Sequence, residues 1–401
     1  MAKTRRVSII LVFGFILLLA LSGITHAQDM TIKIGVMGPF TGPAASIGQE
    51  QLNWAKLAVA DFNEANDTNI ELVEGDTELD PAKAVTVAEQ LIADDAIYAV
   101  VGPAGSQEVE AVEPMFQEAG LVHISSSATS PTLTTSGFET FFRVVPTDAA
   151  QGPTVGNFLA NELMVTSLYV IDDQTSYAVG LADEAIAAFE EAGGTIAGRD
   201  SVTQEDVDFS ALVTKVGGSG AEAIFFPGQI ASQGALFALQ MQEQGVDAIL
   251  FGADGFQSVD DFIVGAAGAS EGAYVSAFAP DIHELESSAD VVSRFEEEYG
   301  EFGTFGPPTY AATLVALEAV QSAMEAGDLT RAAVLEAVGA TDMEMSVLGG
   351  PLAFDENGDV LDAAFYIFQV QGDNFVFIPV ESDMEEDMEM MEPEATEEAS
   401  G

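Results

Sequence analysis

Apolar residues follow two different periods along this chain. Short runs rich in Val, Ile and Phe alternate with longer segments in which apolar residues recur every three or four positions. The short runs predict buried strands, and the longer segments predict amphipathic helices. We predict strands at 31–38, 70–76, 97–102, 121–125, 167–173, 221–228 and 248–254. We predict helices at 50–66, 80–95, 106–120, 177–194, 208–220, 233–245, 287–300 and 307–327.

The alternation of strands with helices predicts the fold class. Strand–helix–strand units form right-handed crossovers, which make neighbouring strands parallel and cover both faces of the sheet with helices. The series stops after "FRVVPTD" (142–148) and starts again at residue 167, and 401 residues are enough for two domains. We therefore predict an α/β protein with two lobes of similar plan. A terminal hairpin is predicted over 350–380, with its turn at Asn357–Gly358.

The first 27 residues have the layout of a secretory signal peptide. A basic start, "MAKTRR", precedes an apolar run, and "THA" places a cleavage site after Ala27. The apolar run approaches the length of a membrane span, so retention as an anchor is the alternative. The chain has no cysteine, which excludes disulfides, thiolate chemistry and lipid attachment through cysteine. We expect an exported protein that works in the periplasm or outside the cell.

The charge of the chain excludes one class of partner. The sequence has 66 acidic residues against 11 Lys and Arg, a net charge of −55. Such a surface repels phosphate backbones, so nucleic-acid binding is not expected. Residues 381–401 are acidic without apolar periodicity, which predicts a disordered tail. Copper binding by the methionines of the tail is the alternative to a solvated low-complexity segment.

Searches for catalytic and metal-binding motifs give no match. The chain has no P-loop, no G-x-G-x-x-G and no G-x-S-x-G nucleophile elbow. After export two histidines remain, His123 and His283, and neither has a partner at zinc-binding spacing. "DENGD" at 355–359 begins like a calcium loop, but Val360 stands where glycine is required and Tyr366 where glutamate is required. We predict no catalytic residue, no metal and no cofactor, and therefore no enzyme.

Small polar residues follow the predicted strands at their carboxyl ends. Ligands of open parallel sheets bind at this edge. Each cluster alone is typical of an ordinary turn, but together they predict a pocket between the two lobes. The clusters are "GPFTGPAASIG" (38–48), "GPAGS" (102–106), "SSSAT" (125–129), "DDQTSY" (172–177), "PGQIASQ" (227–233) and "GADG" (252–255).

The chain resembles the substrate-binding proteins of branched-chain amino acid ABC transporters. The resemblance is carried by "AGLVHISSSATSPTLT" (119–134), "FFRVVPTDAAQGPTVGNFL" (141–159) and "FGADG" (251–255). It implies the type I periplasmic binding protein fold, with two Rossmann-like lobes and parallel sheets joined by a three-segment hinge. Lobe 1 is then expected at 31–146 and 278–353, and lobe 2 at 147–277 and 354–380.

The same resemblance implies a set of ligand contacts. Ser106 matches a serine that binds the α-carboxylate of the ligand. The stretch Ser127–Ala128–Thr129 matches backbone and hydroxyl contacts to the carboxylate and the α-amino group. Tyr177 matches an aromatic residue over the ligand head, and Asp254 an acidic residue that pairs with the ammonium. Hydroxyl and N–H donors suit a carboxylate, and a carboxylate suits an ammonium.

Two matched positions depart from the family pattern. Ile47 stands where branched-chain binders often have an aromatic residue, and it either keeps the pocket wall apolar or anchors its loop. Gln229 replaces a frequent tyrosine, which leaves open a polar amino acid or an amide or urea-type solute. The resemblance implies a monomer that captures an amino acid and delivers it to ABC transporter permease subunits. The alternative is a ligand-sensing module of a receptor system.

Overall fold

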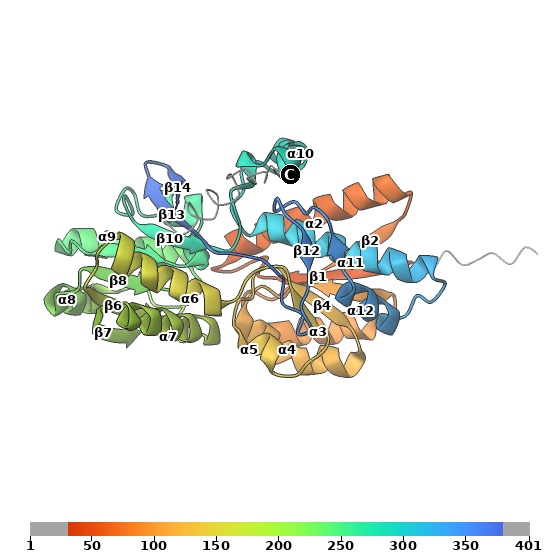
Figure 1. Cartoon of the computed structure of the whole chain (residues 1–401), viewed down its shortest axis with the longest axis horizontal. Helices are drawn as coiled ribbons and strands as arrows, with labels where there is room; N and C mark the ends of the chain where they lie inside the picture. The colour runs from red at the N-terminus through yellow and green to blue at the C-terminus, as the bar shows by residue number, and fades with distance from the viewer. Residues whose placement is uncertain (1–30, 380–401) are drawn as a thin grey trace, which may run out of the picture.

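The computed structural model describes residues 31–379. The predicted signal peptide (1–27) and the predicted tail (381–401) lie outside the described residues. Two α/β lobes lie side by side along the long axis of the molecule (Figure 1). Within the described part of the chain, no helix combines the length and the apolar character needed to span a membrane.

The first lobe is built on a five-stranded sheet with the order β2-β1-β3-β4-β5. All of its strand pairs are parallel. Its strands are β1 (Ile32–Gly38), β2 (Ile70–Asp76), β3 (Ile97–Val101), β4 (Val122–Ser125) and β5 (Phe141–Arg143). Its main helices are α2 (Ala45–Asn66), α3 (Pro81–Ala93), α4 (Ser106–Ala119), α11 (Gly306–Glu325) and α12 (Arg331–Gly339).

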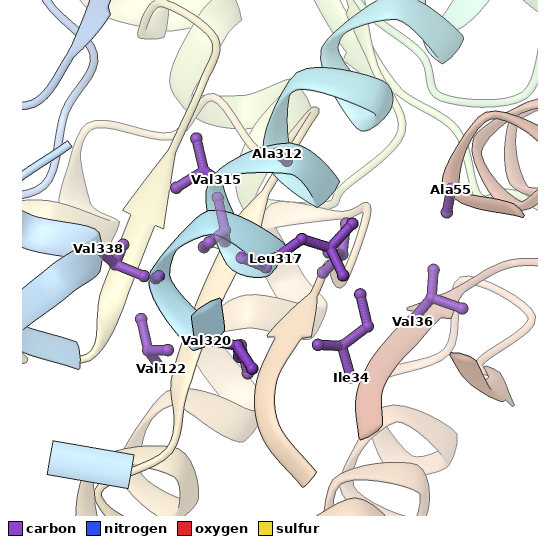
Figure 2. Packing of buried hydrophobic residues seen from close by; sticks show 14 of the residues in the cluster. Ile34, Val36, Ala55, Val122, Ala312, Val315, Leu317, Val320 and Val338 are labelled. Carbon is purple, nitrogen blue, oxygen red and sulfur yellow. The ribbon is translucent and has the colours of Figure 1, made fainter. Parts of the chain in front are cut away.

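The core of the first lobe joins segments that are far apart in the sequence. Figure 2 shows Ile34 and Val36 of β1 and Val122 of β4 in one apolar cluster with Val315 and Val320 of α11. These five side chains are at most 2% exposed. Helix α11 therefore belongs to the first lobe although it follows the whole second lobe in the sequence.

The second lobe has a seven-stranded sheet with the order β14-β13-β10-β9-β8-β6-β7. Its strands are β6 (Ser167–Asp172), β7 (Thr195–Ser201), β8 (Ala223–Phe226), β9 (Ile249–Gly252), β10 (Tyr274–Ala277), β13 (Tyr366–Gln371) and β14 (Asn374–Ile378). Its helices include α6 (Asp148–Asn157), α7 (Ser176–Glu191), α8 (Ser210–Ser219) and α9 (Ala231–Gln244). Strands β13 and β14 are antiparallel to their neighbours, because a tight turn joins them where a parallel pair would need a crossover. The predicted parallel sheets are confirmed in both lobes, and the antiparallel strands belong to the terminal hairpin at one edge of the second sheet.

The predicted hairpin over 350–380 is wrong in its extent. The Asn357–Gly358 turn closes only a short bridge between Phe354 and Val360, and it packs on the first lobe, where Asp359 pairs with Arg143. The true hairpin is β13–β14, which turns at Gly372 with a φ of 64°. The chain thus leaves the first lobe near residues 361–365, after the boundary at 353/354 that the resemblance implied.

Four shorter elements complete the first lobe. They are α5 (Thr132–Thr135), α10 (Ala289–Tyr299), β11 (Asp342–Met343) and β12 (Leu352–Ala353). Helix α10 packs on α2 of the first lobe, where Phe295 stacks on Trp54 with ring centroids 4.2 Å apart. The pair β11–β12 is antiparallel and lies close to the Phe354–Val360 bridge.

One apolar cluster joins the segments that connect the lobes. Val145 comes from the first connection, Phe278 and Ala279 from the second, and Phe365 from the third. They pack against Ile47 and Phe305 of the first lobe. Because all three connections contribute to this cluster, it forms a common hinge core beneath the cleft.

Candidate ligand-binding site

A small cavity lies between the two lobes, above the hinge core. Six of the eight predicted site residues line it, namely Ile47, Ser106, Ser127, Tyr177, Gln229 and Asp254. Sequence reasoning missed the other lining residues, which are Leu79, Ala104, Gly255 and Phe305. The free space is about 20 Å³, room for about one water molecule. The structure therefore shows the cleft in a closed form.

The N-terminus of helix α4 forms part of the first-lobe wall of the cavity and can bind an anion. Ser106 is the first residue of α4, and its hydroxyl accepts a hydrogen bond from the Ser130 N–H at 3.2 Å. The first N–H groups of a helix have no partner within the helix, and with the helix dipole they favour a bound anion. The Glu108 carboxyl takes one of these donors, the Gly105 N–H, at 2.8 Å. Burial raises the pKa of Glu108 to about 7, which limits the negative charge that this side chain brings to the N-terminus of α4.

The serine-rich loop after β4 is held by its own hydroxyls. The Ser127 hydroxyl donates to the Ala104 carbonyl and accepts from the Gln51 amide, both at 3.0 Å. The Ser125 hydroxyl donates to the Pro103 carbonyl at 2.8 Å and accepts from the N–H of Ala128 at 3.0 Å. These bonds fix the loop against the neighbouring β3–α4 loop. The serines thus build the wall of the cavity.

A buried arginine, Arg143, binds the backbone of the same serine-rich loop. The Arg143 side chain is fully buried, and its guanidinium donates to the carbonyls of Ala128 (3.1 Å) and Ser130 (2.7 Å). It also donates to the Thr134 hydroxyl at 2.8 Å and pairs with Asp359 at 2.5 Å. Sequence reasoning missed this role. No local signal marks its partner Asp359, which lies 216 positions away in the sequence.

Two predicted residues lie behind the cavity wall in the closed form. Ala128 packs in the first lobe against Val109, Leu133 and Phe141. Thr129 is fully buried, and its hydroxyl makes no hydrogen bond. Its carbonyl accepts the Asp148 N–H at 2.9 Å. The structure therefore does not bring Ala128 and Thr129 to the cavity surface with the other six residues.

The second-lobe wall contains the carboxyl group of Asp254, which two hydrogen bonds fix in place. Asp254 follows β9, and its Oδ1 accepts from the Tyr177 hydroxyl at 2.6 Å and from the Gln151 amide at 2.7 Å. Gln151 also donates to the Ser276 hydroxyl at 2.9 Å. Burial raises the pKa of Asp254, and the two donors oppose that shift. The phenol of Tyr177 thus orients the carboxylate.

A second carboxyl lies behind this wall. Asp148 begins α6, is fully buried, and has no hydrogen-bond partner on either carboxyl oxygen. Burial raises its pKa to about 8, and the charge of Asp254 adds to this shift. At neutral pH this carboxyl is therefore mostly protonated, whereas the Tyr177 and Gln151 donors favour the ionised form of Asp254. Sequence reasoning missed Asp148.

Gln229 is already engaged by the protein. Its amide oxygen accepts from Gln107 of the first lobe at 2.8 Å and from Gln204 at 3.0 Å. Its backbone N–H donates to Asp173 at 3.1 Å. The amide oxygen that was expected to meet a polar ligand is thus occupied by other side chains, which weakens the case for an amide or urea-type solute.

The remaining wall is apolar. Ile47, Leu79, Ala104 and Phe305 face the cavity. Ile47 also belongs to the hinge core, so both expectations for this residue, an apolar wall and a loop anchor, agree with its position. A ligand in the closed cleft would meet polar groups at two places and hydrocarbon between them.

Neither histidine can serve this site as a base. His123 is fully buried in the first lobe between the rings of Phe116 and Phe141, and burial lowers its pKa to about 3. His283 lies outside the cavity and contacts Asp281 and Glu296. Among residues 31–379, no cluster of three His, Asp or Glu side chains is arranged to hold a metal ion.

Comparisons with known proteins agree with this geometry. The family model of the periplasmic binding proteins matches residues 31–374. A leucine-, isoleucine-, valine-, threonine- and alanine-binding protein of Pseudomonas aeruginosa is 30% identical over 84% of this chain and 90% of its own length. An amino acid binding protein of the same organism is 34% identical over 77% and 82%. The solved branched-chain amino acid binding protein LivJ of Streptococcus pneumoniae, in complex with isoleucine, superposes with a TM-score of 0.79 at 25% identity, covering 87% and 99%.

These findings define the class of the protein. The chain belongs to the periplasmic binding protein family, and its fold is the type I fold that the resemblance implied. It is a solute-binding protein whose relatives serve ABC transporters.

Proposed function

We propose that this protein captures an α-amino acid with an aliphatic side chain in the cleft and delivers it, unchanged, to the permease subunits of an ABC transporter. The observation that carries the proposal is that a helix N-terminus and a carboxyl face one cavity from opposite lobes. Asp254 on the second lobe faces the cavity that the start of α4 and Ser106 face from the first lobe. An α-amino acid has the two complementary groups, an ammonium and a carboxylate, bonded to the same carbon atom.

The carboxylate end fits the first lobe. The N-terminus of α4 supplies N–H donors, and no lysine or arginine lines the cavity. Hydrogen bonds without a fixed cation hold an anion firmly in a closed, dry cleft and weaken when water enters. Such a subsite suits a protein that must release its ligand to a transporter.

The ammonium end fits the second lobe. One oxygen of Asp254 is held by Tyr177 and Gln151, which leaves the other for the ligand. Because Asp148 is mostly protonated at neutral pH, it adds little negative charge beside Asp254, which leaves Asp254 as the partner for one ammonium.

The ligand side chain fits the apolar wall. Ile47, Leu79 and Phe305 offer hydrocarbon, and the Gln229 amide oxygen is already bonded. We therefore favour leucine, isoleucine or valine over a polar amino acid. The Pseudomonas relative is named for leucine, isoleucine and valine as well as threonine and alanine, and LivJ was solved with isoleucine, which supports an aliphatic ligand. The predicted signal peptide supports a location outside the cytoplasm, and we propose that the protein acts there as a monomer.

A calorimetric series tests the proposal. L-leucine is compared with 4-methylvalerate, which lacks the ammonium, and with isopentylamine, which lacks the carboxylate. Leucine should bind and raise the melting temperature by mass action, and each half-molecule should bind much more weakly. Urea and glutamine serve as polar controls. Binding of urea or glutamine without leucine binding would refute the aliphatic assignment, and equal binding of 4-methylvalerate would refute an ammonium subsite.

A further inference from the structure

An amide pair joins the two lobes at the edge of the cavity. Gln107, the second residue of α4, belongs to the first lobe, and Gln229, between β8 and α9, belongs to the second. Gln107 Nε2 donates to Gln229 Oε1 at 2.8 Å, and Gln229 Nε2 donates back to Gln107 Oε1 at 3.4 Å. The two residues are 122 positions apart in the sequence. Both bonds can exist only while the lobes are together.

The second-lobe half of the pair is held in place. Gln204 Nε2 donates to Gln229 Oε1 at 3.0 Å and to Asp173 Oδ2 at 3.1 Å. The same Asp173 oxygen accepts the backbone N–H of Gln229 at 3.1 Å. Gln229 is 9% exposed, so water competes little for its amide in the closed form. Hydrogen bonds within the second lobe therefore orient Gln229 independently of its contact with Gln107.

An apolar contact accompanies the amide pair. Ile230, the residue after Gln229, packs against Ala44 and Leu79 of the first lobe. All three side chains are less than 10% exposed. Opening the cleft would return this surface to water while breaking the amide pair. Both contacts favour the closed form, and neither passes through the ligand.

Resting on the proposed function, we propose that the Gln107–Gln229 pair is a latch that stabilises the closed cleft and so sets the affinity for every ligand by one common factor. A ligand that binds only the closed form gains apparent affinity in proportion to the closed population. Because Gln229 Oε1 is used by Gln107 and Gln204, Gln229 does not select among ligand side chains. This assigns Gln107, which lies outside the cavity, a positioning role in binding.

The test replaces each amide by an apolar group of similar size. Gln107→Leu and Gln229→Leu are compared with the double variant, and Gln242→Leu, at an exposed position near the end of α9, is the matched control. Losing the pair should weaken binding of leucine and of alanine by the same factor, roughly 2- to 10-fold, as expected for one net hydrogen bond. The double variant should lose little more than either single variant, because both remove one interaction. Loss factors that differ between the two ligands, or that multiply in the double variant, would overturn the latch.

A second measurement separates the latch from the proposed function. The chain has no cysteine, so Gln90→Cys on α3 and Glu190→Cys on α7 give one labelling site per lobe for energy transfer. Without ligand, Gln107→Leu should lower the closed fraction, and Gln242→Leu should leave it unchanged. If amino acids fail to bind the parent protein but Gln107→Leu still lowers the closed fraction of the cleft, the latch is supported and the proposed amino-acid binding is refuted. An unchanged closed fraction in Gln107→Leu refutes the latch whatever the ligand.

Discussion

Asp254→Asn replaces the carboxyl that faces the cavity by a neutral amide of the same shape, which cannot form an ion pair with an ammonium. Asp254 is 4% exposed, and two neutral donors, the Tyr177 hydroxyl and the Gln151 amide, hold one of its oxygens. Truncating one partner of a buried, hydrogen-bonded charge pair typically costs about 2–5 kcal/mol of binding. We expect the lower end of that range for the single variant, about 2 kcal/mol, or roughly 30-fold in Kd.

The reason is the second carboxyl. The charge of Asp254 is one of the causes that raise the pKa of Asp148 to about 8. When Asn replaces Asp254, that contribution disappears, and Asp148 can ionise more easily beside the bound ammonium. Asp148→Asn alone should cost little at neutral pH. The double variant Asp148→Asn/Asp254→Asn should cost clearly more than the sum of the two single variants, because no carboxyl then remains to ionise.

Isothermal calorimetry with leucine at pH 7 measures these losses. Asp260→Asn, at an exposed position of the second lobe, is the matched control for a lost surface charge. Affinity for 4-methylvalerate, which has no ammonium, should not fall in Asp254→Asn. Unchanged leucine affinity in Asp254→Asn would remove this residue from the site and with it the argument for an α-ammonium ligand.

The other predictions concern stability and the tail. Truncation after Val380 should leave the leucine Kd and the melting temperature nearly unchanged, because the acidic residues beyond it lack the apolar periodicity for docking; a large drop in melting temperature would contradict this. Arg143→Met should lower the free energy of unfolding by about 3 kcal/mol or more in urea titrations, because it breaks a buried pair and frees two loop carbonyls; a loss below 1 kcal/mol would count against this role. Burial raises the pKa of Glu50 and Glu108 to about 7 and that of Asp148 to about 8, so the folded protein binds more protons than the unfolded chain from about pH 4.5 to pH 8. The free energy of unfolding should therefore fall as the pH rises through this range, and a rise would contradict these pKa shifts.

Local signals in the sequence predicted most of the elements. Asp80 followed by Pro81 marks the start of α3, where the Asp80 carboxylate accepts the N–H groups of Ala82 and Lys83. Gly120 marks the end of α4 with a left-handed φ of 59°. Strand β5 was missed because its three residues are too short to show a period. The terminal hairpin was misplaced because Asn-Gly is an equally good turn signal in a short loop, and only the contacts with the first lobe decide.

Residues that line the cavity could be predicted from the sequence, whereas residues that act through another residue could not. Ser106, Tyr177 and Asp254 follow strand ends, where the sequence itself points to a pocket. Arg143 and Gln107 act through partners 216 and 122 positions away, and such pairs leave no local pattern. Contacts of this kind become visible only once the fold has brought both partners together.

Small-angle scattering with and without leucine tests most directly whether a ligand is gripped between the lobes. In the structure the cleft is closed, with first-lobe and second-lobe side chains lining one cavity. Open lobes must exist for the ligand to enter, and only the closed form lets both walls touch one small molecule. The radius of gyration should therefore fall when leucine reaches a concentration that saturates the protein in calorimetry. An unchanged radius of gyration at that concentration would contradict the account.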